Sequence, residues 1–539
     1  MIKQLLEQMA AKLENIFQML GLFREFLELS DDGIKTTIKR KCDKFFRKMT
    51  FKGEALTFND VRLRTCYSDV LPRDVVTKTK FSRNVWLNIP IVSAPMSDVT
   101  ESPMAIALAR LGGLGIINKR LSPERQAAEV KKVKHCLGAF LANPVCVNPE
   151  DTVEKVLKMK EQDGLKFWSF PVIDEVGKLI GMATRSYFDF CQNNQLSIGK
   201  IMSTEVISVD GEIGIDKAYK LMMEKKIRTL PVLGAGGELK GIYTLRDVKR
   251  IIHGDKADYN VGPDGSLCVG AAVSVGKDLK KRLELLSEAK VDVVVIDCAH
   301  GWTAGCLEAL RWCKKKYPQI DVVAGNISEA GAALDLVKAG ADGVRIGQGP
   351  GSICTTRIVA GIGTPQITAV YSCAKALRDY DIPCCADGGI KYSGDITLAL
   401  GAGADNVMLG NALAGTTESP GELIVSAEGG TAQKRYRGEG SLGAMLESQA
   451  SRERYGQKDE PREKLVPEGV EGTVPFKGDV AAIVYQLIGG LRSGMGYLGA
   501  KDISELHENA DFYQMSSAGL YESHPHDLQS IKKAPNYQC

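Results

Sequence analysis

Eight short apolar runs, each followed by a segment with helical spacing, constrain the fold of this chain more than any other feature. The runs are continuously apolar and do not alternate, which is typical of parallel strands buried on both faces. Eight strand–helix units are the number found in a (β/α)8 TIM barrel, so we predict an α/β fold of that kind. The predicted strands are Ile89–Val92, Gly113–Asn118, Cys268–Val273, Val291–Asp297, Ile320–Asn326, Gly343–Gly347, Ile382–Asp387 and Asn406–Gly410.

An internal repeat interrupts the series between the second and third predicted strands. Phe170–Ile173 and Gly181–Thr184 recur as Leu230–Leu233 and Gly241–Thr244 at a constant offset. This repeat resembles a tandem pair of cystathionine-β-synthase (CBS) domains. We therefore predict that a CBS pair is inserted into the barrel.

The CBS resemblance implies a binding cleft for adenine or guanine nucleotides, ATP or GTP, between the two repeats. Thr244 and Asp247 match the family's ribose-binding Thr-x-x-Asp pattern, whereas the first repeat has Tyr187 at the aspartate position. A purely structural insert is the alternative, since each repeat needs its partner to bury a core whether or not it binds a ligand.

The predicted division of the chain follows from these patterns. Residues 1–50 form an N-terminal extension with an amphipathic helical pattern, which we expect to pack on the protein itself, with a membrane or partner surface as the alternative. The barrel occupies 51–136 and 257–539, and the CBS domains cover about 137–197 and 198–256. Residues 429–475 have little periodicity, and we expect an irregular lid or a disordered linker there.

Composition excludes several classes of protein. The net charge of +3 predicts no strong field for nucleic acid or a membrane surface. The 14 cysteines follow no disulfide or zinc spacing, which favours reduced thiols and a cytoplasmic location. No apolar run approaches the roughly 20 residues of a membrane span.

A glycine-rich loop follows the sixth predicted strand and carries a candidate nucleophile. It reads Gly347-Gln-Gly-Pro-Gly-Ser-Ile-Cys354-Thr-Thr356. Glycines allow the backbone to approach a ligand closely, and a cysteine at the mouth of a barrel can act as a nucleophile. On its own, Cys354 is equally explained as a small apolar filler.

Two further loops add a predicted nucleotide site. Asp387, Gly388 and Gly389 follow the seventh strand, and Gly410 and Asn411 follow the eighth. Glycine-rich loops at these positions are the usual phosphate site of such barrels. Asp387 is placed to accept hydrogen bonds from a ribose diol, so we predict that a nucleoside monophosphate lies here with its base toward Cys354.

Taken together and in order, several segments resemble the inosine monophosphate (IMP) dehydrogenase family, from about Leu56 to the C-terminus. The bacterial branch is the most similar. The segments are Ser93-Ala-Pro-Met96, Gly349-Pro-Gly-Ser-Ile-Cys-Thr-Thr-Arg357, Ala386-Asp-Gly-Gly-Ile390, Tyr436-Arg-Gly438 and Arg454-Tyr455.

The resemblance implies an NAD-dependent oxidation of IMP to xanthosine monophosphate. Cys354 would attack C2 of the purine, and hydride would pass to NAD⁺. A flap would then close over the vacated nicotinamide site while water hydrolyses the covalent adduct. Arg454 would be the general base, assisted by Tyr455 and Thr356, although the solution pKa of arginine, above about 12, makes it an unusual base.

The same resemblance implies the binding residues and the assembly. NAD would contact Asp297, Asn326, Gly347 and Gly349. Potassium would bind carbonyls of Gly349, Gly351 and Cys354, with Glu522, Ser523 and His524 of a neighbouring subunit, which implies a homotetramer. Nucleotide binding to the CBS pair would shift it toward an octamer. The implied substrate-binding residues are Ser93, Arg345, Ser352, Asp387, Gly388, Gly389, Gly410, Asn411, Tyr436, Gly438, Glu439, Gly440 and Glu468.

Three positions depart from the family pattern. Glu439 stands where the family usually has methionine in the base-contacting loop, Asn411 replaces serine after the eighth strand, and Ser97 replaces aspartate after the first. A Glu439 carboxylate pointing inward would add a charge near the base. The proposed nucleophile and base are unaffected.

Two rival functions remain open at this stage. Guanosine monophosphate (GMP) reductase shares the barrel, the cysteine and the threonine, but its pattern has a catalytic glutamate where this chain has Leu442, and it lacks the Arg-Tyr pair. The other rival is an inactive nucleotide-sensing or single-stranded nucleic-acid-binding homologue, suggested by the CBS pair. The retention of nucleophile, flap pair and phosphate loops argues against it.

Overall fold

A computed structural model describes residues 40–537 except 137–139, 142–143, 163–164, 166, 254–257, 426–430 and 533. The amphipathic pattern predicted near the N-terminus lies outside the described residues. No described helix is long and apolar enough to cross a membrane.

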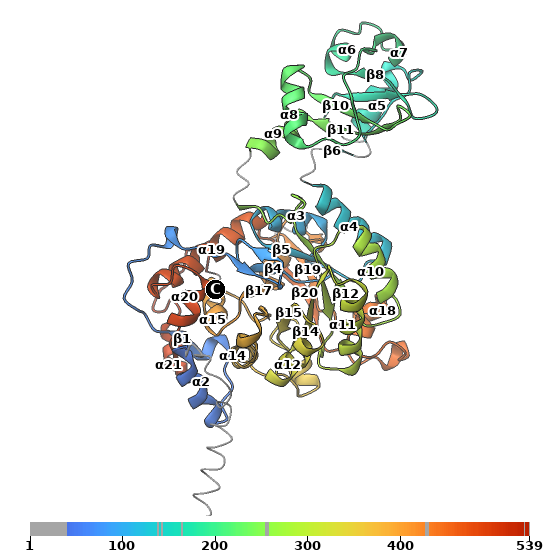
Figure 1. Cartoon of the computed structure of the whole chain (residues 1–539). Helices are drawn as coiled ribbons and strands as arrows, with labels where there is room; N and C mark the ends of the chain where they lie inside the picture. The colour runs from blue at the N-terminus through green and yellow to red at the C-terminus, as the bar shows by residue number, and fades with distance from the viewer. Residues whose placement is uncertain are drawn as a thin grey trace, which may run out of the picture. The chain divides into compact units, whose positions relative to one another are not determined.

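Eight parallel strands close into a barrel, and the predicted fold is confirmed (Figure 1). Each predicted strand run overlaps one observed strand, with bounds that differ by a few residues at most. The neighbours around the barrel follow the order β12-β13-β14-β15-β16-β17-β4-β5. Their bounds are β4 Ile91–Ser93, β5 Leu114–Ile117, β12 Val269–Val273, β13 Val293–Asp297, β14 Asp321–Ile327, β15 Gly343–Ile346, β16 Cys384–Asp387 and β17 Asn406–Leu409.

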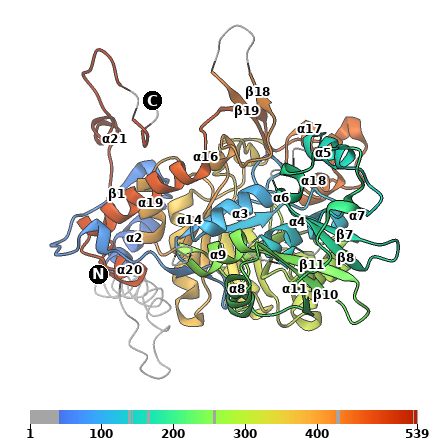
Figure 2. The same cartoon turned by 90° about the horizontal axis from the view of Figure 1, so that it is seen from above.

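Helices surround the strands (Figures 1 and 2), and their apolar faces bury the outer side of the barrel. Local signals begin several of them, because a side-chain oxygen satisfies a free N–H of the first turn. Ser122 accepts from the Arg125 N–H, and Thr303 accepts from the Cys306 N–H. The helices are α3 Ser102–Arg110, α4 Pro123–His135, α10 Leu279–Glu288, α11 Ala304–Lys316, α12 Ala330–Lys338, α13 Thr356–Val359, α14 Gln366–Leu377, α15 Ser393–Gly401, α16 Asn411–Ala414 and α19 Val480–Tyr497.

The chain between α4 and β12 forms two small sheets with separate apolar cores. One sheet has the order β6-β11-β10-β9, and the other pairs β7 with β8. The repeated sequence segments form the two hairpins β7–β8 and β10–β11, each with the proline in its first strand. The elements are β6 Phe140–Leu141, α5 Val153–Gln162, β7 Phe170–Ile173, β8 Leu179–Ala183, α6 Arg185–Asp189, α7 Ile198–Ile201, β9 Val209–Asp210, α8 Ile215–Glu224, β10 Thr229–Leu233, β11 Leu239–Thr244 and α9 Leu245–His253.

The segment 429–475 contains regular structure in its described part, so the expectation of an irregular stretch was wrong. β19 (Gln433–Arg437) pairs antiparallel with β20 (Glu471–Pro475), and β18 (Leu423–Ile424) extends the sheet. The strands are far apart in the sequence, and local periodicity therefore did not reveal them. Between them lie α17 Leu442–Glu447, α18 Gln449–Arg454 and the short 3-10 turn Arg462–Lys464.

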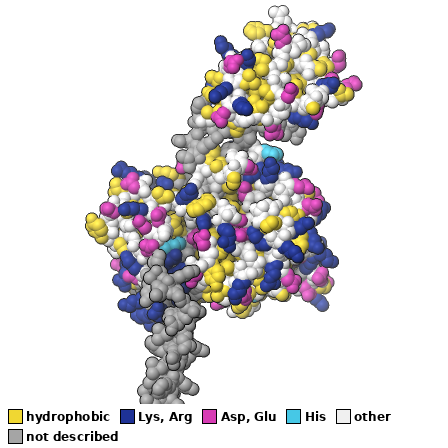
Figure 3. Space-filling model, viewed as in Figure 1, with side chains coloured by type: hydrophobic (Ala, Val, Ile, Leu, Met, Phe, Trp, Pro, Cys, Tyr) yellow, Lys and Arg dark blue, Asp and Glu magenta, His cyan; other side chains and the backbone are white. Residues whose placement is uncertain are grey.

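The remaining elements pack around the barrel. Phe81, in the turn between β2 (Thr79–Lys80) and β3 (Trp86–Leu87), is fully buried in the interior core. α2 (Cys42–Phe51) packs Phe46 on Tyr371 with ring centroids 4.0 Å apart. Charged side chains of both signs are mixed over the visible surface (Figure 3). The other elements are β1 Val61–Leu63, α20 Ile503–Asn509, β21 Phe512–Gln514 and α21 Ser517–Glu522.

Candidate active site

Strand periodicity decides which side chains face the barrel interior. Val293 and Val295 of β13 belong to the inner core, whereas Val294 and Ile296 belong to the outer one. Because side chains alternate along a strand, Asp297 continues the inner face. Arg345 of β15 is level with Cys385 of β16, an inner residue, and Asp387 lies two residues further along β16 on the same side. Three charged groups therefore converge at the carboxyl ends of neighbouring strands.

These strand ends open into a pocket of about 510 Å³. Most of the predicted site residues line it, which brings together segments from five of the eight barrel strands and from the segment 429–475. The predicted residues in its wall are Asp297, Asn326, Arg345, Gly347, Gly349, Gly351, Ser352, Cys354, Thr356, Asp387, Gly388, Gly389, Gly410, Asn411, Tyr436, Gly438, Glu439, Arg454, Tyr455 and Glu468.

A few predicted residues do not line the pocket. Ser93 faces outward because its neighbour Val92 faces inward, and its hydroxyl accepts a hydrogen bond from Thr100 at 2.8 Å. Gly440 lies behind the wall, where a Cβ would meet the Tyr455 ring at 2.6 Å. Residues 522–524 lie outside the wall as well. Their predicted partner is a neighbouring subunit, so the single chain does not test that role.

The Cys354 loop is held by short local contacts. The Cys354 N–H donates to the Gly351 carbonyl at 3.1 Å, and its thiol donates to the Thr356 hydroxyl at 3.2 Å. The loop is also tied to the far side of the pocket, because the Thr355 N–H donates to the Glu468 carbonyl at 3.1 Å. The half-buried thiol thus faces the pocket from an anchored loop, as a nucleophile requires.

Three positively charged side chains surround the Asp297 carboxylate. Burial alone would raise the pKa of this carboxyl, but Arg454, Lys119 and Arg345 outweigh that effect and lower the pKa well below its ordinary value. Lys119 lies 3.4 Å from its Oδ2, and Arg345 and Arg454 both form ion pairs with its Oδ1. Asp297 is therefore an ionised acceptor that is already occupied by the arginine of α18.

The second carboxylate, Asp387, is linked to the first through Arg345. The Arg345 side chain is only 1% exposed and lies 3.7 Å from Asp387 Oδ2, besides its contact with Asp297. The Asn326 amide donates to the same Asp387 oxygen and to the Gly347 carbonyl, both at 2.8 Å. The other carboxylate oxygen of Asp387 remains available to accept from a ligand, as a ribose diol site requires.

Comparison with known proteins assigns this geometry to a family. The family model for the IMP dehydrogenase / GMP reductase domain matches residues 55–526. The chain belongs to this family. Both named activities are oxidation–reduction reactions, so the chain is an oxidoreductase. The resemblance inferred from the motifs is confirmed.

Curated relatives of this family are similar over nearly their whole length. The IMP dehydrogenase of Aquifex aeolicus is 49% identical over 90% of this chain and 98% of its own. That of Bacillus subtilis is 46% identical over 90% of this chain and 98% of its own. A solved structure of a GMP reductase variant from Trypanosoma brucei, in complex with guanosine 5'-monophosphate, is also similar. Its TM-score is 0.78 at 39% identity, covering 88% of this chain and 98% of that chain.

Arg454 forms an ion pair with Asp297, and Tyr455 lines the same pocket as Cys354. Burial lowers the pKa of Arg454, but the facing Asp297 carboxylate outweighs it, and the net pKa lies above the ordinary value. Burial raises the pKa of Tyr455 to about 12, although Arg454 opposes the shift. Both groups are therefore protonated in this arrangement at neutral pH, and the pair carries one positive charge.

Two lysines of the site escaped the motif analysis. Lys119, 5% exposed, follows β5 and donates to the Asp297 carbonyl as well as facing its carboxylate. Lys477 lines the pocket near the loop after β17, and burial lowers its pKa. Lys119 had a readable signal, since a charged residue directly after a buried strand is unusual. Lys477 had none, because it follows β20, a strand that local periodicity does not reveal.

The inserted sheets contain a second pocket of about 500 Å³. Thr244 and Asp247 are both in its wall, and the Thr244 hydroxyl donates to the Asp247 carboxylate at 2.6 Å. Arg228 and Lys249 also line it, which gives the pocket cationic groups. The predicted ribose pair is thus at a cavity of ligand size, and its nucleotide remains a prediction.

Proposed function

We propose that this chain oxidises IMP to xanthosine monophosphate with NAD⁺ through a covalent intermediate on Cys354. One observation carries the proposal: the Cys354 thiol and the Arg454–Tyr455 pair face the same pocket, which also contains Asp387, Asn326 and the glycine loops after β16 and β17. A nucleophile, a ribose acceptor and a phosphate-binding edge are the parts that the chemistry requires.

The oxidation step begins with the bound nucleotide. Asp387 holds the ribose diol, the N–H groups after β16 and β17 hold the phosphate, and Cys354 as thiolate adds to C2 of the purine. Asp297 and Asn326 would hold NAD⁺, which would supply the acceptor for the hydride that leaves C2. The sulfur–carbon bond remains, and the product of this step is a thioimidate on Cys354.

The hydrolysis step uses the flap. With the dinucleotide gone, Arg454 pairs with Asp297 and Tyr455 covers the Cys354 loop. Water adds to C2, its proton passes to the Arg454–Tyr455–Thr356 group, and the sulfur–carbon bond breaks to restore the thiolate. Because Asp297 raises the pKa of Arg454, the proton-accepting role requires that Arg454 first share its proton with a neighbour.

Asp297 has two successive partners in this scheme. The ribose of NAD and the Arg454 guanidinium require the same ionised oxygens, so the closed flap and the bound dinucleotide exclude one another. This exclusion separates the two steps, because the flap pair can approach C2 for hydrolysis only after the dinucleotide has left.

A potassium ion fits the chemistry of the Cys354 loop. Carbonyl oxygens are hard ligands suited to such a cation, and Gly349, with φ of +80°, has a left-handed backbone conformation that favours glycine in this loop. The carbonyls of Gly349, Gly351 and Cys354 would hold it, with Glu522, Ser523 and His524 of a neighbouring subunit, in a homotetramer. The ion would steady the loop that carries the nucleophile.

GMP reductase is the second candidate, because the chain is similar to the T. brucei GMP reductase structure. The reductase pattern expects glutamate at the position of Leu442, whose side chain cannot exchange protons. The Arg454–Tyr455 pair also has no place in that pattern. NADH formation from IMP and NAD⁺ supports the dehydrogenase, whereas ammonia release from GMP with NADPH supports the reductase. Mass spectrometry of the trapped enzyme tests for the adduct on Cys354.

For the insert, we propose that ATP or GTP binds at Thr244 and Asp247 and shifts the tetramer toward an octamer. Sedimentation with and without saturating nucleotide tests this, and an unchanged profile contradicts it. We also propose a cytoplasmic location, because the cysteines follow no disulfide spacing.

A further inference from the structure

Two of the three departures from the family pattern are in direct contact. The Ser97 N–H, in the loop after β4, donates to Glu439 Oε1 at 2.9 Å. The Ser451 hydroxyl, in the middle of α18, donates to Glu439 Oε2 at 3.1 Å. Each oxygen of the Glu439 carboxylate therefore binds a different segment: one belongs to the barrel rim and the other to the helix that carries Arg454.

This contact also resolves the orientation of Glu439. Its carboxylate is directed to Ser97 and Ser451, although the residue lines the pocket. The contact uses the backbone N–H of Ser97, so it does not depend on the side chain at that position. The Ser97 side chain is bound to Arg120 instead.

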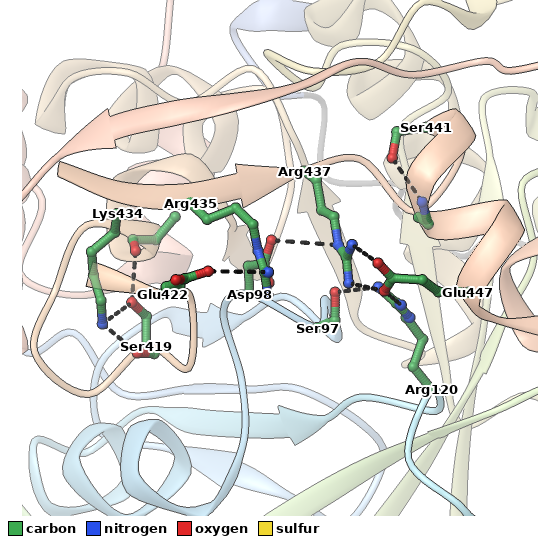
Figure 4. Close-up of polar contacts among 12 residues, drawn as sticks. Ser97, Asp98, Arg120, Ser419, Glu422, Lys434, Arg435, Arg437, Ser441 and Glu447 are labelled. Atoms are coloured by element: carbon green, nitrogen blue, oxygen red, sulfur yellow. Dashed lines mark hydrogen bonds and ion pairs between the residues drawn. The ribbon is translucent and has the colours of Figure 1, made fainter. Parts of the chain in front are cut away.

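A chain of ion pairs fixes the segments that flank Glu439 (Figure 4). Arg120, after β5, donates to the Ser97 hydroxyl and to Glu447 Oε2, both at 2.9 Å. Arg437, at the end of β19, donates to both oxygens of Glu447 at 3.0 and 2.7 Å. Arg437 also lies 3.8 Å from the buried Asp98. The loop 438–440 is thereby tied to the barrel rim on both sides.

α18 has further contacts with the rim, including the Glu453 carboxylate packed against Gly276 after β12. The Arg454 side chain pairs with Asp297, and the Ala299 N–H donates to the Arg454 carbonyl at 3.3 Å. Ser451 precedes Arg454 and Tyr455 by about one helical turn, so all three lie on one face of α18. The Asp297 contact is lost whenever a ligand takes Asp297, whereas the Glu439 contact depends only on whether α18 is closed.

We propose that Glu439 is a positioning residue that latches α18 in the closed state by binding Ser97 and Ser451 simultaneously. The inference rests on the proposed function for its kinetic consequences, but the latch itself is a property of the fold. It sets the balance between dinucleotide binding and hydrolysis. Its removal weakens closure without touching the nucleophile or the ribose site.

The kinetic test replaces Glu439 by methionine. Hydrogen bonds to a charged group contribute enough to shift the closure equilibrium about tenfold. We expect kcat to fall about tenfold, the KM for NAD⁺ to fall, and the first-turnover burst of NADH to keep its rate, while the adduct on Cys354 accumulates. Glu439→Gln retains one acceptor oxygen and should give an intermediate effect. A burst slowed as much as kcat, or an unchanged kcat and KM, overturns the proposal.

Matched serine variants separate the latch from general damage to α18. Ser451→Ala removes the helix arm and should reproduce part of the Glu439→Met effect. Ser448→Ala changes a serine at the start of the same helix whose side chain makes no capping bond, and it should behave as the parent. Equal effects of the two alanine variants overturn the proposal.

A turnover-independent readout keeps the latch distinguishable from the proposed function. Amide hydrogen exchange of residues 449–455 should be about tenfold faster in Glu439→Met and Ser451→Ala than in the parent or Ser448→Ala. If the parent forms no NADH from IMP while this pattern holds, the proposed function fails and the latch stands. If exchange is the same in all four proteins, the latch fails whatever the activity.

Discussion

The barrel rim and α18 supply opposite sides of one pocket, but different forces hold them. On the rim, Arg345 is 1% exposed and joins carboxylates of β13 and β16 inside the folded core. α18 is joined to the rim by Arg454 and by one backbone hydrogen bond. Ser451 is joined to it indirectly, through the Glu439 carboxylate. The comparison teaches that the binding groups are part of the fold, whereas the hydrolytic groups are held by contacts that can break and reform.

The largest expected effect lies on the rim side, at the nucleophile. Cys354→Ala should lower turnover by at least about 10³-fold, since removing a covalent nucleophile leaves only binding. Nucleotide binding, measured by calorimetry, should remain. Cys191→Ser, a thiol of the inserted sheets, is the control with unchanged turnover. Turnover that survives in the alanine variant contradicts the covalent mechanism.

The next effect is on stability and compares two arginines that bind the same carboxylate. Arg345→Met leaves buried charges on Asp297 and Asp387 uncompensated, and should lower the free energy of unfolding by about 3–5 kcal/mol. Arg454→Met leaves Asp297 with Lys119 and Arg345 and should cost about 1 kcal/mol. Denaturant unfolding measures both. Equal losses would show that α18 is as much a part of the core as the rim.

The pH dependence of the flap sharpens the same comparison. The folded-state pKa of Asp297 is depressed, so its stabilising contribution is present above the unfolded value near 4 and is lost only as pH falls through the much lower folded value. The Arg454–Asp297 contact should therefore hold from about pH 5 to pH 9. Hydrogen exchange in α18 at several pH values checks this, and a transition near neutrality contradicts it.

Tyr455 adds a second pH expectation. Burial raises its pKa to about 12, so the phenol stays neutral below that pH. The hydrolysis rate, measured from the decay of the adduct, should show no ionisation of Tyr455 between neutral pH and about pH 10. Tyr455→Phe should lower the rate by about tenfold without changing the shape of the profile.

The smallest expected effect on turnover comes from the inserted pocket. Asp247→Ala should weaken ATP or GTP binding by about tenfold, because a charged acceptor for ribose hydroxyls is lost. Turnover in the absence of nucleotide should be unchanged. Equilibrium binding of a fluorescent nucleotide measures the first, and NADH formation the second. An unchanged affinity would favour a purely structural insert.

Local patterns in the sequence predict the barrel and most of the residues at its rim. Apolar runs such as Val293–Asp297 are read from neighbouring residues, and glycines around Cys354 predict a ligand-binding loop. The outward direction of Ser93 was also readable, since a period of two places it opposite Val92. The alternation of side chains along the strand would therefore have removed Ser93 from the predicted pocket residues.

The β19–β20 pairing and the site lysine Lys477 were beyond such reasoning. Gln433 pairs with Pro475, and nothing within either short segment indicates its partner. The ion pair between Arg454 and Asp297 could not be predicted either. Each residue has many oppositely charged residues in the sequence as possible partners.

The sequence by itself determined the eight strands, the repeat, the nucleophile loop and the family, because these depend on the order and spacing of residues along the chain. The tertiary structure decided which charges meet: Arg345 between two carboxylates, and Glu439 between Ser97 and Ser451. Closure of the barrel sets those distances, since it brings together strand ends and loops from opposite parts of the chain.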